Sequence, residues 1–448
     1  MDILFSHGTI VTMDEAMHLY TDGFLGVTDG KISYLGKTPP PESEKPARLI
    51  DASGMVLIPG LINCHAHLPM TLLRGYADDY ALDTWLNQYI FPREARLDAR
   101  SVKAGALLGI CECLQFGVTS VSDMYLFTDA VADAVAQAGI KANLGVSMAM
   151  GPEDIDNAEG FDPQRFSPFL ELQQMREKWH GYDNGRIQID ACLHSVYTST
   201  YPLWDAVSEY AISEGLRMQL HLSETQKEQD ECLARYGLSP AEVLDCHHVF
   251  DVPTTAAHCV HLSESDRRLL AKRGVTAVHC PVSNLKLASG QADVLSMVKS
   301  GLNVALGTDS AASNNNLDLF EEMKAACLVA KGRTADPTAM APEAALMMAT
   351  VCGAKAQGRQ RECGMLKLGM DADLAMLDFS APHLMPCHNV VSSLVYAASG
   401  RDVRLTMVRG KILYIDGQFP TIELGAVVKE LADHAISTVF SNTPPEKG

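Results

Sequence analysis

Residues 59–69 read PGLINCHAHLP, a short apolar run that ends in two histidines separated by one alanine. Side chains two positions apart on a strand point to the same face, so His65 and His67 can direct both imidazoles at one point. Because histidine is a common metal ligand, the pair indicates a metal site. A coincidental pair at the end of a strand is the alternative, and the rest of the chain has to decide between the two.

The chain from this point to about residue 310 alternates short β-branched runs with helical stretches. The apolar runs lie at 55–63, 118–123, 141–148, 187–194, 217–224, 254–261, 275–281 and 303–310. Helical candidates between them include 101–116 and 263–272, and the second opens with a serine cap and an acidic first turn. Such alternation is typical of βα units around a parallel sheet, and eight strands favour a closed (β/α)₈ barrel over an open sheet.

Both ends of the chain have a different, β-rich pattern. The stretches ILFSHGTIVTM and FLGVTDGKISYLG precede a polar, proline-rich link, and GMLKLGMDADLAMLDF and RLTMVRGKILYIDGQF follow residue 364. We therefore expect an α/β protein with its barrel at 57–364. Residues 1–56 and 365–448 would form one small composite β domain, and the second segment would also supply a terminal helix.

Composition excludes several classes of protein. The 448 residues are 47% hydrophobic and 20% charged, with a net charge of −19, which argues against binding to nucleic acid and gives no support for binding to an anionic membrane. No signal-peptide pattern and no run of 18 apolar residues occurs. The 12 cysteines are scattered without a Cys-x-x-Cys motif. We expect a cytoplasmic protein with reduced thiols.

Polar side chains gather at the C-terminal ends of the predicted strands, which form the active face of such barrels. They are His65, His67, Asp123, His194, His221, Glu224, His258, His261, His279 and Asp309. A single buried histidine is more often a hydrogen-bonded core residue than a ligand, but this concentration at one face favours a metal site.

The favoured ligand set is three histidines and one aspartate: His65, His67, His221 and Asp309. Three imidazoles and a carboxylate suit one divalent ion, most readily Zn²⁺ with Fe²⁺, Mn²⁺ or Ni²⁺ as alternatives, and leave room for a water. Such an ion lowers the pKa of that water toward about 7. Asp309 can also accept the proton that the water loses.

Other strand-end residues have weaker assignments. Glu224 lies three positions after His221 and can move a proton to the substrate, although it can instead cap the following helix. His258 can polarise the attacked group or be an ordinary core histidine. His279 and His261 are candidates for side chains that orient the ligands. The neighbouring cysteines are expected to be inert buried thiols.

The motifs PGLINCHAHLPMTLLRGYADD, HLSETQKE, AAHCVHL, HCPVSNLKLASG and LGTDSAASNNNLDLFEEM together resemble the amidohydrolase superfamily. Within it, they are most similar to the 5′-methylthioadenosine/S-adenosylhomocysteine deaminases. The resemblance implies a distorted TIM-type (β/α)₈ barrel with a small β-sandwich from both chain ends, and a homo-oligomer, either a dimer or a tetramer. It assigns the four ligands to one metal ion, a proton shuttle to Glu224, and a role in hydrolysis to His258. His194 stands where two-metal members carry a lysine, which implies a mononuclear site.

The same resemblance implies a substrate pocket for a purine nucleoside. It places the segment DTWLNQYIFPREARL as a loop over the pocket, with Trp85 in the lining and Glu94 accepting hydrogen bonds from two ribose hydroxyls. His194 would face the ribose or the purine. A packed helix tryptophan and a solvated helix glutamate are the plainer alternatives.

One departure from the family concerns the homocysteine tail. Members that accept S-adenosylhomocysteine place arginines after the third strand, whereas this strand ends SMAMGPEDIDNAEG, with several acids and no arginine. Arg165 is a candidate substitute. Methylthioadenosine, adenosine and 5′-deoxyadenosine are therefore favoured as substrates over S-adenosylhomocysteine. Met148 and Met150 suit an apolar 5′ substituent.

The resulting expectation is a hydrolytic deaminase that converts an adenine nucleoside into its inosine analogue and ammonia. One rival keeps the chemistry and changes the substrate to guanine, to another heterocycle or to an s-triazine. A second rival is a non-catalytic assembly module with the same barrel.

Overall fold

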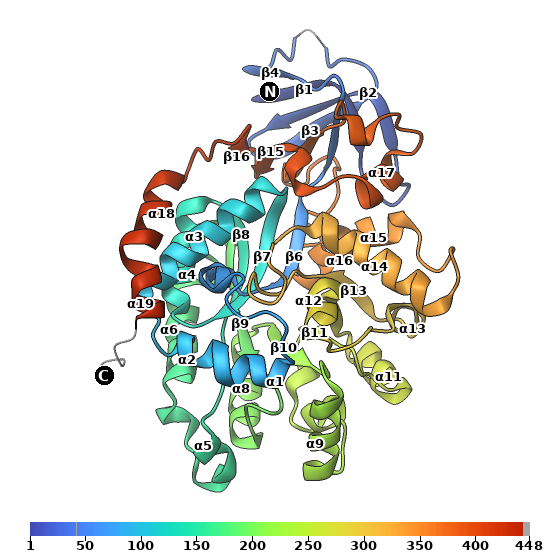
Figure 1. Ribbon diagram of the computed structural model, residues 1–448. Coiled ribbons are helices and arrows are strands. Elements are labelled where there is room, and N and C mark those ends of the chain that lie inside the picture. Colours follow the sequence, from blue (N-terminus) through green and yellow to red (C-terminus); the bar gives the residue numbers. More distant parts are fainter. Residues whose placement is uncertain (42, 442–448) are drawn as a thin grey trace.

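The barrel predicted from the sequence is present in the computed structural model, which describes residues 1–41 and 43–441 (Figure 1). Eight parallel strands follow one another in chain order around it. They are β6 (Leu61–Ala66), β7 (Val118–Tyr125), β8 (Lys141–Val146), β9 (Ile187–Leu193), β10 (Met218–Leu222), β11 (Thr254–His258), β12 (Thr276–His279) and β13 (Asn303–Leu306).

The barrel closes between its first strand and the segment that follows its last strand. The Asn63 side chain donates to the Thr308 hydroxyl at 2.7 Å and accepts from the Thr308 backbone N–H at 3.1 Å. At the next residue, the Asp309 N–H donates to the His65 carbonyl at 3.0 Å. Closure therefore takes place at residues that the sequence assigns to the metal site.

Helices surround this barrel and cover its strands on the outside (Figure 1). The longer ones are α3 (Ala99–Gln115), α4 (Thr128–Ala138), α6 (Ser167–Trp179), α8 (Tyr201–Glu214), α9 (Gln226–Tyr236), α11 (Glu264–Arg273) and α14 (Leu319–Thr334). The shorter ones are α1 (Leu82–Thr84), α2 (Phe91–Glu94), α5 (Pro152–Asp156), α7 (Tyr182–Gly185), α10 (Pro240–Cys246), α12 (Pro281–Lys286), α13 (Val294–Lys299), α15 (Pro342–Met348) and α16 (Val351–Ala356). The two helices predicted at 101–116 and 263–272 correspond to α3 and α11, and a Ser263–Asp266 capping box starts the second.

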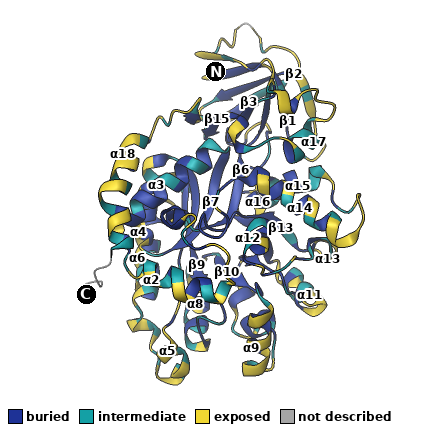
Figure 2. Ribbon diagram, in the orientation of Figure 1, coloured by how far each residue is buried: buried dark blue, intermediate teal, exposed yellow. Residues whose placement is uncertain are grey.

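Burial follows the two-layer arrangement of strands and helices. Every residue of β7, β8 and β11 is buried, as expected for strands covered on both faces. Figure 2 shows these strands in dark blue and the outer helices with exposed faces in yellow. Within the described residues, each helix is too short or too polar to span a bilayer.

The two chain ends meet in a second sheet, as the sequence predicts. Its strands are β1 (Ile3–Val11), β2 (Leu19–Thr28), β3 (Lys31–Gly36), β4 (Arg48–Asp51), β5 (Met55–Pro59), β14 (Leu374–Asp378), β15 (Val403–Val408) and β16 (Lys411–Ile415). The apolar run 55–63 is divided between the two sheets at Gly60. A Cβ there would lie 2.2 Å from the Thr119 side chain, so glycine is needed at this crossing.

The last helices return to the barrel, after α17 (Val390–Tyr396). The segments α18 (Leu424–Glu430) and α19 (Ile436–Phe440) lie beside α3 (Figure 1). Arg100 pairs with Glu430, and the His434 Nε2 lies 2.9 Å from the Asp98 carboxylate. This C-terminal helical segment packs on the barrel.

One buried lysine joins the barrel to the composite sheet. Lys141, the first residue of β8, has a fully buried side chain with 0% exposure. Its Nζ lies 2.6 Å from Asp371 and 2.5 Å from Asp373, which both precede β14. A buried charge of this kind is tolerated because its partners are charged and hydrogen-bonded to it.

Replacing Lys141 by methionine removes the buried cation that Asp371 and Asp373 share, and leaves Asp371 with Lys31 and Arg409. We expect the K141M variant to lose about 3–5 kcal/mol of stability, measured as a lower midpoint of guanidinium unfolding. The matched control is Lys31→Met, since Lys31 also pairs with Asp371 but is 52% exposed and should cost under about 1 kcal/mol. Equal midpoints for the two variants would contradict this role of Lys141.

Candidate metal centre

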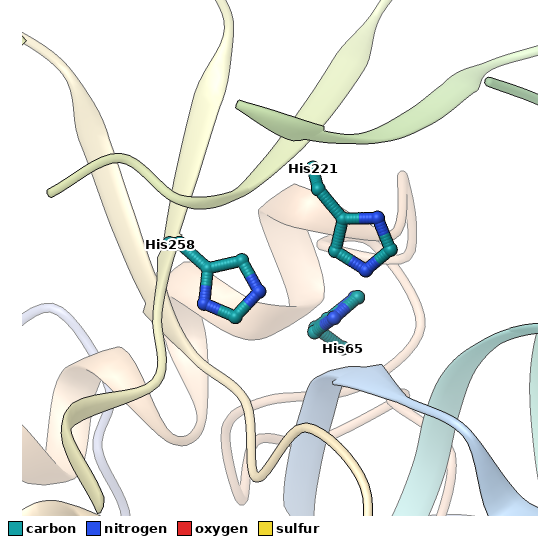
Figure 3. Close-up of side chains that lie close together, drawn as sticks. All are labelled: His65, His221 and His258. Carbon is teal, nitrogen blue, oxygen red and sulfur yellow. The ribbon is translucent and has the colours of Figure 1, made fainter. Parts of the chain in front are cut away.

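The C-terminal ends of β6, β10 and β11 bring three imidazoles together. Figure 3 shows His65, His221 and His258 reaching from these strands toward a common point. One ring nitrogen from each lies within 4.8 Å of those of the other two, and all three residues are buried. The strand-end histidines predicted from the sequence therefore do converge.

A second group shares His65 and adds two more residues. The His65 and His67 Nε2 atoms lie 3.5 Å and 3.2 Å from Oδ1 of Asp309. The His67 Nε2 also lies 3.3 Å from the His221 Nε2. The structure thus places His65, His67, His221 and Asp309 around one point, with His258 beside them.

Hydrogen bonds fix which nitrogen three of these rings present. The Nδ1–H of His67 donates to the Met124 carbonyl at 2.6 Å, and that of His221 donates to the His194 carbonyl at 2.7 Å. The His258 Nδ1 lies 2.8 Å from the Asn284 side-chain oxygen. Because each Nδ1 is bonded to an oxygen, each Nε2 is the nitrogen that is left to bind a metal.

Two serine hydroxyls orient the carboxylate of Asp309. The hydroxyls of Ser283 and Ser313 both donate to Oδ2, at 2.6 Å and 2.8 Å. Oδ1 is thereby left to face the imidazoles. Neither serine is predicted from the sequence, although the SNLKLASG motif and the segment after GTDS contain them. Nothing in their spacing indicates that their hydroxyls reach Asp309.

The electrostatics of the cluster fit a divalent cation. Burial lowers the pKa of His65 to about 4, so this imidazole is neutral at pH 7. Burial also disfavours the charged form of His67, but the hydrogen bond and charge of Asp309, the Met124 carbonyl and the charge of Asp123 together outweigh burial and raise the pKa of His67 to about 9. The His65 Nε2 is buried without a hydrogen-bond partner among the described residues. A metal ion would satisfy this atom and replace the proton on His67.

Several residues at these strand ends have left-handed backbone conformations. His258 and Asp309 have φ angles of 71° and 61°, and Ser223, next to Glu224, has φ of 51°. Such left-handed conformations are uncommon for residues with a Cβ and cluster at functional sites. These conformations redirect the side chains from the strand direction into the barrel mouth.

Glu224 lies in the pocket beside the cluster. One carboxylate oxygen is 3.8 Å from the His258 Nε2, and the other accepts from the Ser289 hydroxyl at 3.1 Å. Burial raises the pKa of Glu224, which favours its protonated form. Thr225, rather than Glu224, caps the following helix through the Glu228 N–H. The alternative that Glu224 is a helix cap is therefore wrong.

A pocket of about 280 Å³ extends from the cluster and contains the predicted substrate residues. Trp85, Glu94 and His194 all line it. Trp85 is 4% exposed and donates through its indole N–H to the Ala77 carbonyl at 3.1 Å. Tyr125, which is not predicted from the sequence, also lines the pocket. Burial raises the pKa of Glu94, and the nearby Tyr125 side chain opposes that rise.

The segment over this pocket is helical, whereas the family resemblance implies a loop. Residues Leu82–Glu94 form α1, a π-helical segment η2 (Trp85–Ile90) and α2 without interruption. Burial of Trp85, Leu86 and Ile90 on one side explains the helical form. The segment consequently holds Trp85 and Glu94 in fixed positions over the barrel mouth.

Several strand-end residues lie outside the pocket lining. Both ring nitrogens of His279 are buried without hydrogen-bond partners among the described residues, and His279 does not line the pocket. Asp123 accepts from the Leu68 N–H at 2.5 Å and so holds the turn after β6. Cys64, Cys259 and Cys280 are buried, which raises the pKa of each thiol and keeps it protonated.

Removing one of the two serine hydroxyls should weaken metal binding. We expect Ser283→Ala and Ser313→Ala each to lower the affinity for Zn²⁺ by about 10–100-fold, measured by competition with a chelator. Ser208→Ala is a matched control, since Ser208 is equally buried on α8 and its hydroxyl has no partner among the described residues. Affinities indistinguishable from that of the control would rule out this role for the hydroxyls.

Comparisons with known proteins place this geometry in a family. The model of the amidohydrolase family matches residues 56–413. A 5-methylthioadenosine/S-adenosylhomocysteine deaminase of Acetivibrio thermocellus is 41% identical over 97% of this chain and 100% of its own length. A 5′-deoxyadenosine deaminase of Methanosarcina mazei is 42% identical over 96% of each chain.

A solved structure agrees with these relatives. An adenosine deaminase from Xanthomonas campestris with bound zinc superposes with a TM-score of 0.88 and 32% identity, over 96% of this chain and 97% of that one. The family resemblance drawn from the sequence motifs is confirmed, and with it hydrolytic chemistry at a divalent metal ion. This chain belongs to the amidohydrolase family.

Proposed function

We propose that this protein deaminates adenine nucleosides by hydrolysis, releasing ammonia and the inosine analogue. The observation that carries the proposal is that one pocket is lined by Asp309, His67, Glu224, Trp85 and Glu94. Groups suited to metal-assisted hydrolysis and groups suited to a nucleoside therefore share one cavity. The names of the relatives from Acetivibrio, Methanosarcina and Xanthomonas support the same substrate class.

The metal ion would be held by His65, His67, His221 and Asp309. Zinc is the proposed ion, with Fe²⁺, Mn²⁺ or Ni²⁺ as alternatives, because the donor set is three imidazoles and a carboxylate and the Xanthomonas relative contains zinc. When bound, such an ion supplies an activated water for attack on C6 of the purine.

The surrounding residues would move the protons of the reaction. His258 presents its free Nε2 to the water because its Nδ1–H is bonded to Asn284. Glu224, whose protonated form is favoured by burial, would donate to the purine ring nitrogen next to C6. Asp309 would accept the proton of the water, and His258 with Asp309 would stabilise the tetrahedral centre. The C6–N bond then breaks and ammonia leaves with that proton, while the C6 hydroxyl would return its own proton to Glu224, so that a carbonyl remains at C6.

The far part of the pocket would hold the nucleoside. Glu94 offers acceptors to two ribose hydroxyls, and Tyr125 holds its carboxylate in place. Trp85 would pack against the nucleoside, and His194 would contact the ribose or the purine. The homo-oligomeric state and the cytoplasmic location stay predictions from the sequence and its resemblance.

Ammonia release across a substrate panel tests the proposed function. Adenosine, 5′-deoxyadenosine and methylthioadenosine should each yield ammonia and the inosine analogue, whereas guanine and an s-triazine should not. The His67→Ala variant should lose both bound metal and ammonia release, because an imidazole of the cluster is missing. Turnover of guanine alone would contradict the proposal, and so would full activity of the His67→Ala variant. Wild-type protein that binds no metal would instead favour a non-catalytic assembly module.

The ribose-binding role of Glu94 has a separate test. Glu94→Gln keeps the side-chain length but loses the charge, and kcat/KM for adenosine should fall by about tenfold or more, as expected for a lost hydrogen bond to a charged group. The same substitution should affect 2′,3′-dideoxyadenosine much less, because this substrate lacks both hydroxyls. Equal losses for the two substrates would exclude this role, provided that metal content is unchanged.

A further inference from the structure

A second cavity of about 940 Å³ adjoins the pocket. The two cavities share apolar and aromatic lining residues: Leu82, Leu86, Phe91, Ala149, Tyr197 and Leu287. Asp309, Glu224 and His258 line the inner pocket and are absent from the lining of this outer cavity among the described residues. Since C6 and the 5′ carbon lie at opposite ends of an adenine nucleoside, a nucleoside with C6 at the cluster directs its 5′ end toward the outer cavity.

The wall of the outer cavity is largely apolar. Met150, Pro152 and Ile155 contribute to it from the segment after β8, and Phe91 contributes from the helical segment over the pocket. Met150 is 6% exposed and therefore forms part of a packed surface. A wall of this kind favours a thioether or alkyl group by removing apolar surface from water.

The charged groups of the outer cavity are mostly carboxylates. Among the described residues that line it, Lys227 is the one lysine and no arginine occurs. The Lys227 Nζ lies 3.0 Å from Asp83 and 3.7 Å from Glu231, so two carboxylates already share its charge. The buried carboxylate of Glu228 accepts from two backbone N–H groups of the 223–224 turn.

Arg165, the candidate partner for a homocysteine carboxylate, lies away from the outer cavity. Arg165 is 88% exposed and its Nε lies 3.5 Å from Asp162, and it is not a lining residue of either cavity. The sequence suggestion that Arg165 meets a homocysteine carboxylate is therefore wrong. A carboxylate that enters the outer cavity would meet Asp83 and Glu231, and among the described lining residues Lys227, which already pairs with both, is the one lysine or arginine.

We propose that the outer cavity is the subsite for the 5′ substituent, and that it accepts uncharged apolar or cationic groups and rejects carboxylates. The inference rests on the proposed function and narrows its substrate class. Methylthio and methyl groups match the wall, whereas the homocysteine tail brings its carboxylate toward two others. Like charges a few ångströms apart repel even near a protein surface, and salt screens that repulsion.

Three synthetic substrates that differ at one tail test this subsite. They are the 5′-propylthio, 5′-(3-aminopropyl)thio and 5′-(2-carboxyethyl)thio derivatives of 5′-deoxyadenosine. At low salt, kcat/KM for the carboxylate should be about three- to tenfold below those of the other two, and the gap should narrow as salt is raised. S-Adenosylhomocysteine, whose tail carries both an ammonium and a carboxylate, should lie between the carboxylate substrate and the aminopropyl substrate.

Two results would overturn the proposal. One is a carboxylate substrate as good as the propyl substrate, and the other is a gap that salt does not change, which would mean that shape and not charge selects the tail. Failure of adenosine itself to release ammonia would instead refute the proposed function. The two failures are therefore distinguishable.

A charge reversal at the rim provides the matched test. Glu231→Lys should raise kcat/KM for the carboxylate substrate relative to the propyl substrate by about three- to tenfold. Asp230→Lys is the control, because Asp230 lies on the same helix and changes the net charge equally but does not line the cavity. An equal change in this ratio for both variants, or no change for Glu231→Lys, would overturn the charge-selection proposal.

Discussion

Closure of the barrel is the constraint on which the rest of this structure depends. The side chain of Asn63 donates to the hydroxyl of Thr308, 245 positions away in the chain, and accepts from the Thr308 backbone N–H. The next contact joins the Asp309 N–H to the His65 carbonyl. Because these closing contacts include residues of the cluster itself, closure of the barrel also brings parts of the candidate metal centre together.

Burial of so many polar groups at one point is stabilised by directed hydrogen bonds. Each of His67, His221 and His258 has its Nδ1 paired with an oxygen, and Oδ2 of Asp309 accepts from two hydroxyls. The His65 Nε2, which has no hydrogen-bond partner among the described residues, faces the centre of the cluster. A set of inward-facing ring nitrogens and a carboxylate oxygen, held by hydrogen bonds on their outer sides, is the arrangement that a cation completes.

Two adjoining cavities divide recognition between them. The inner pocket joins the reactive cluster to Glu94, and the outer cavity offers an apolar wall with a carboxylate-rich rim. The helical segment Leu82–Glu94 lines both, since Leu82, Leu86 and Phe91 occur in each lining. Differences within this short segment and in the turn after β8 can therefore alter the 5′ preference while the hydrolytic chemistry stays the same.

Much of this protein could be predicted from local patterns. Alternation of apolar runs and helical stretches located the eight barrel strands, because strands buried on both faces must be apolar and short. The strand-end positions of His65, His221, His258 and Asp309 then implied convergence, since the C-terminal ends of a parallel barrel meet at one face. The motifs added the family and the substrate class.

Other features required the folded chain. The division of the run 55–63 at Gly60 is set by the Thr119 side chain, which is remote in sequence. Likewise, Ser283 reaches Asp309 because of the placement of α12, whereas Ser313 reaches it through the turn that follows Asp309. The separation of Arg165 from both cavities follows from how the segment after β8 packs. The sequence by itself thus determined the barrel, the family and the residue types of the cluster, because these depend on periodicity and on position along each strand. Only the tertiary structure decided which atoms face the metal position and which charges face the 5′ substituent, because those depend on contacts between segments that no local pattern records.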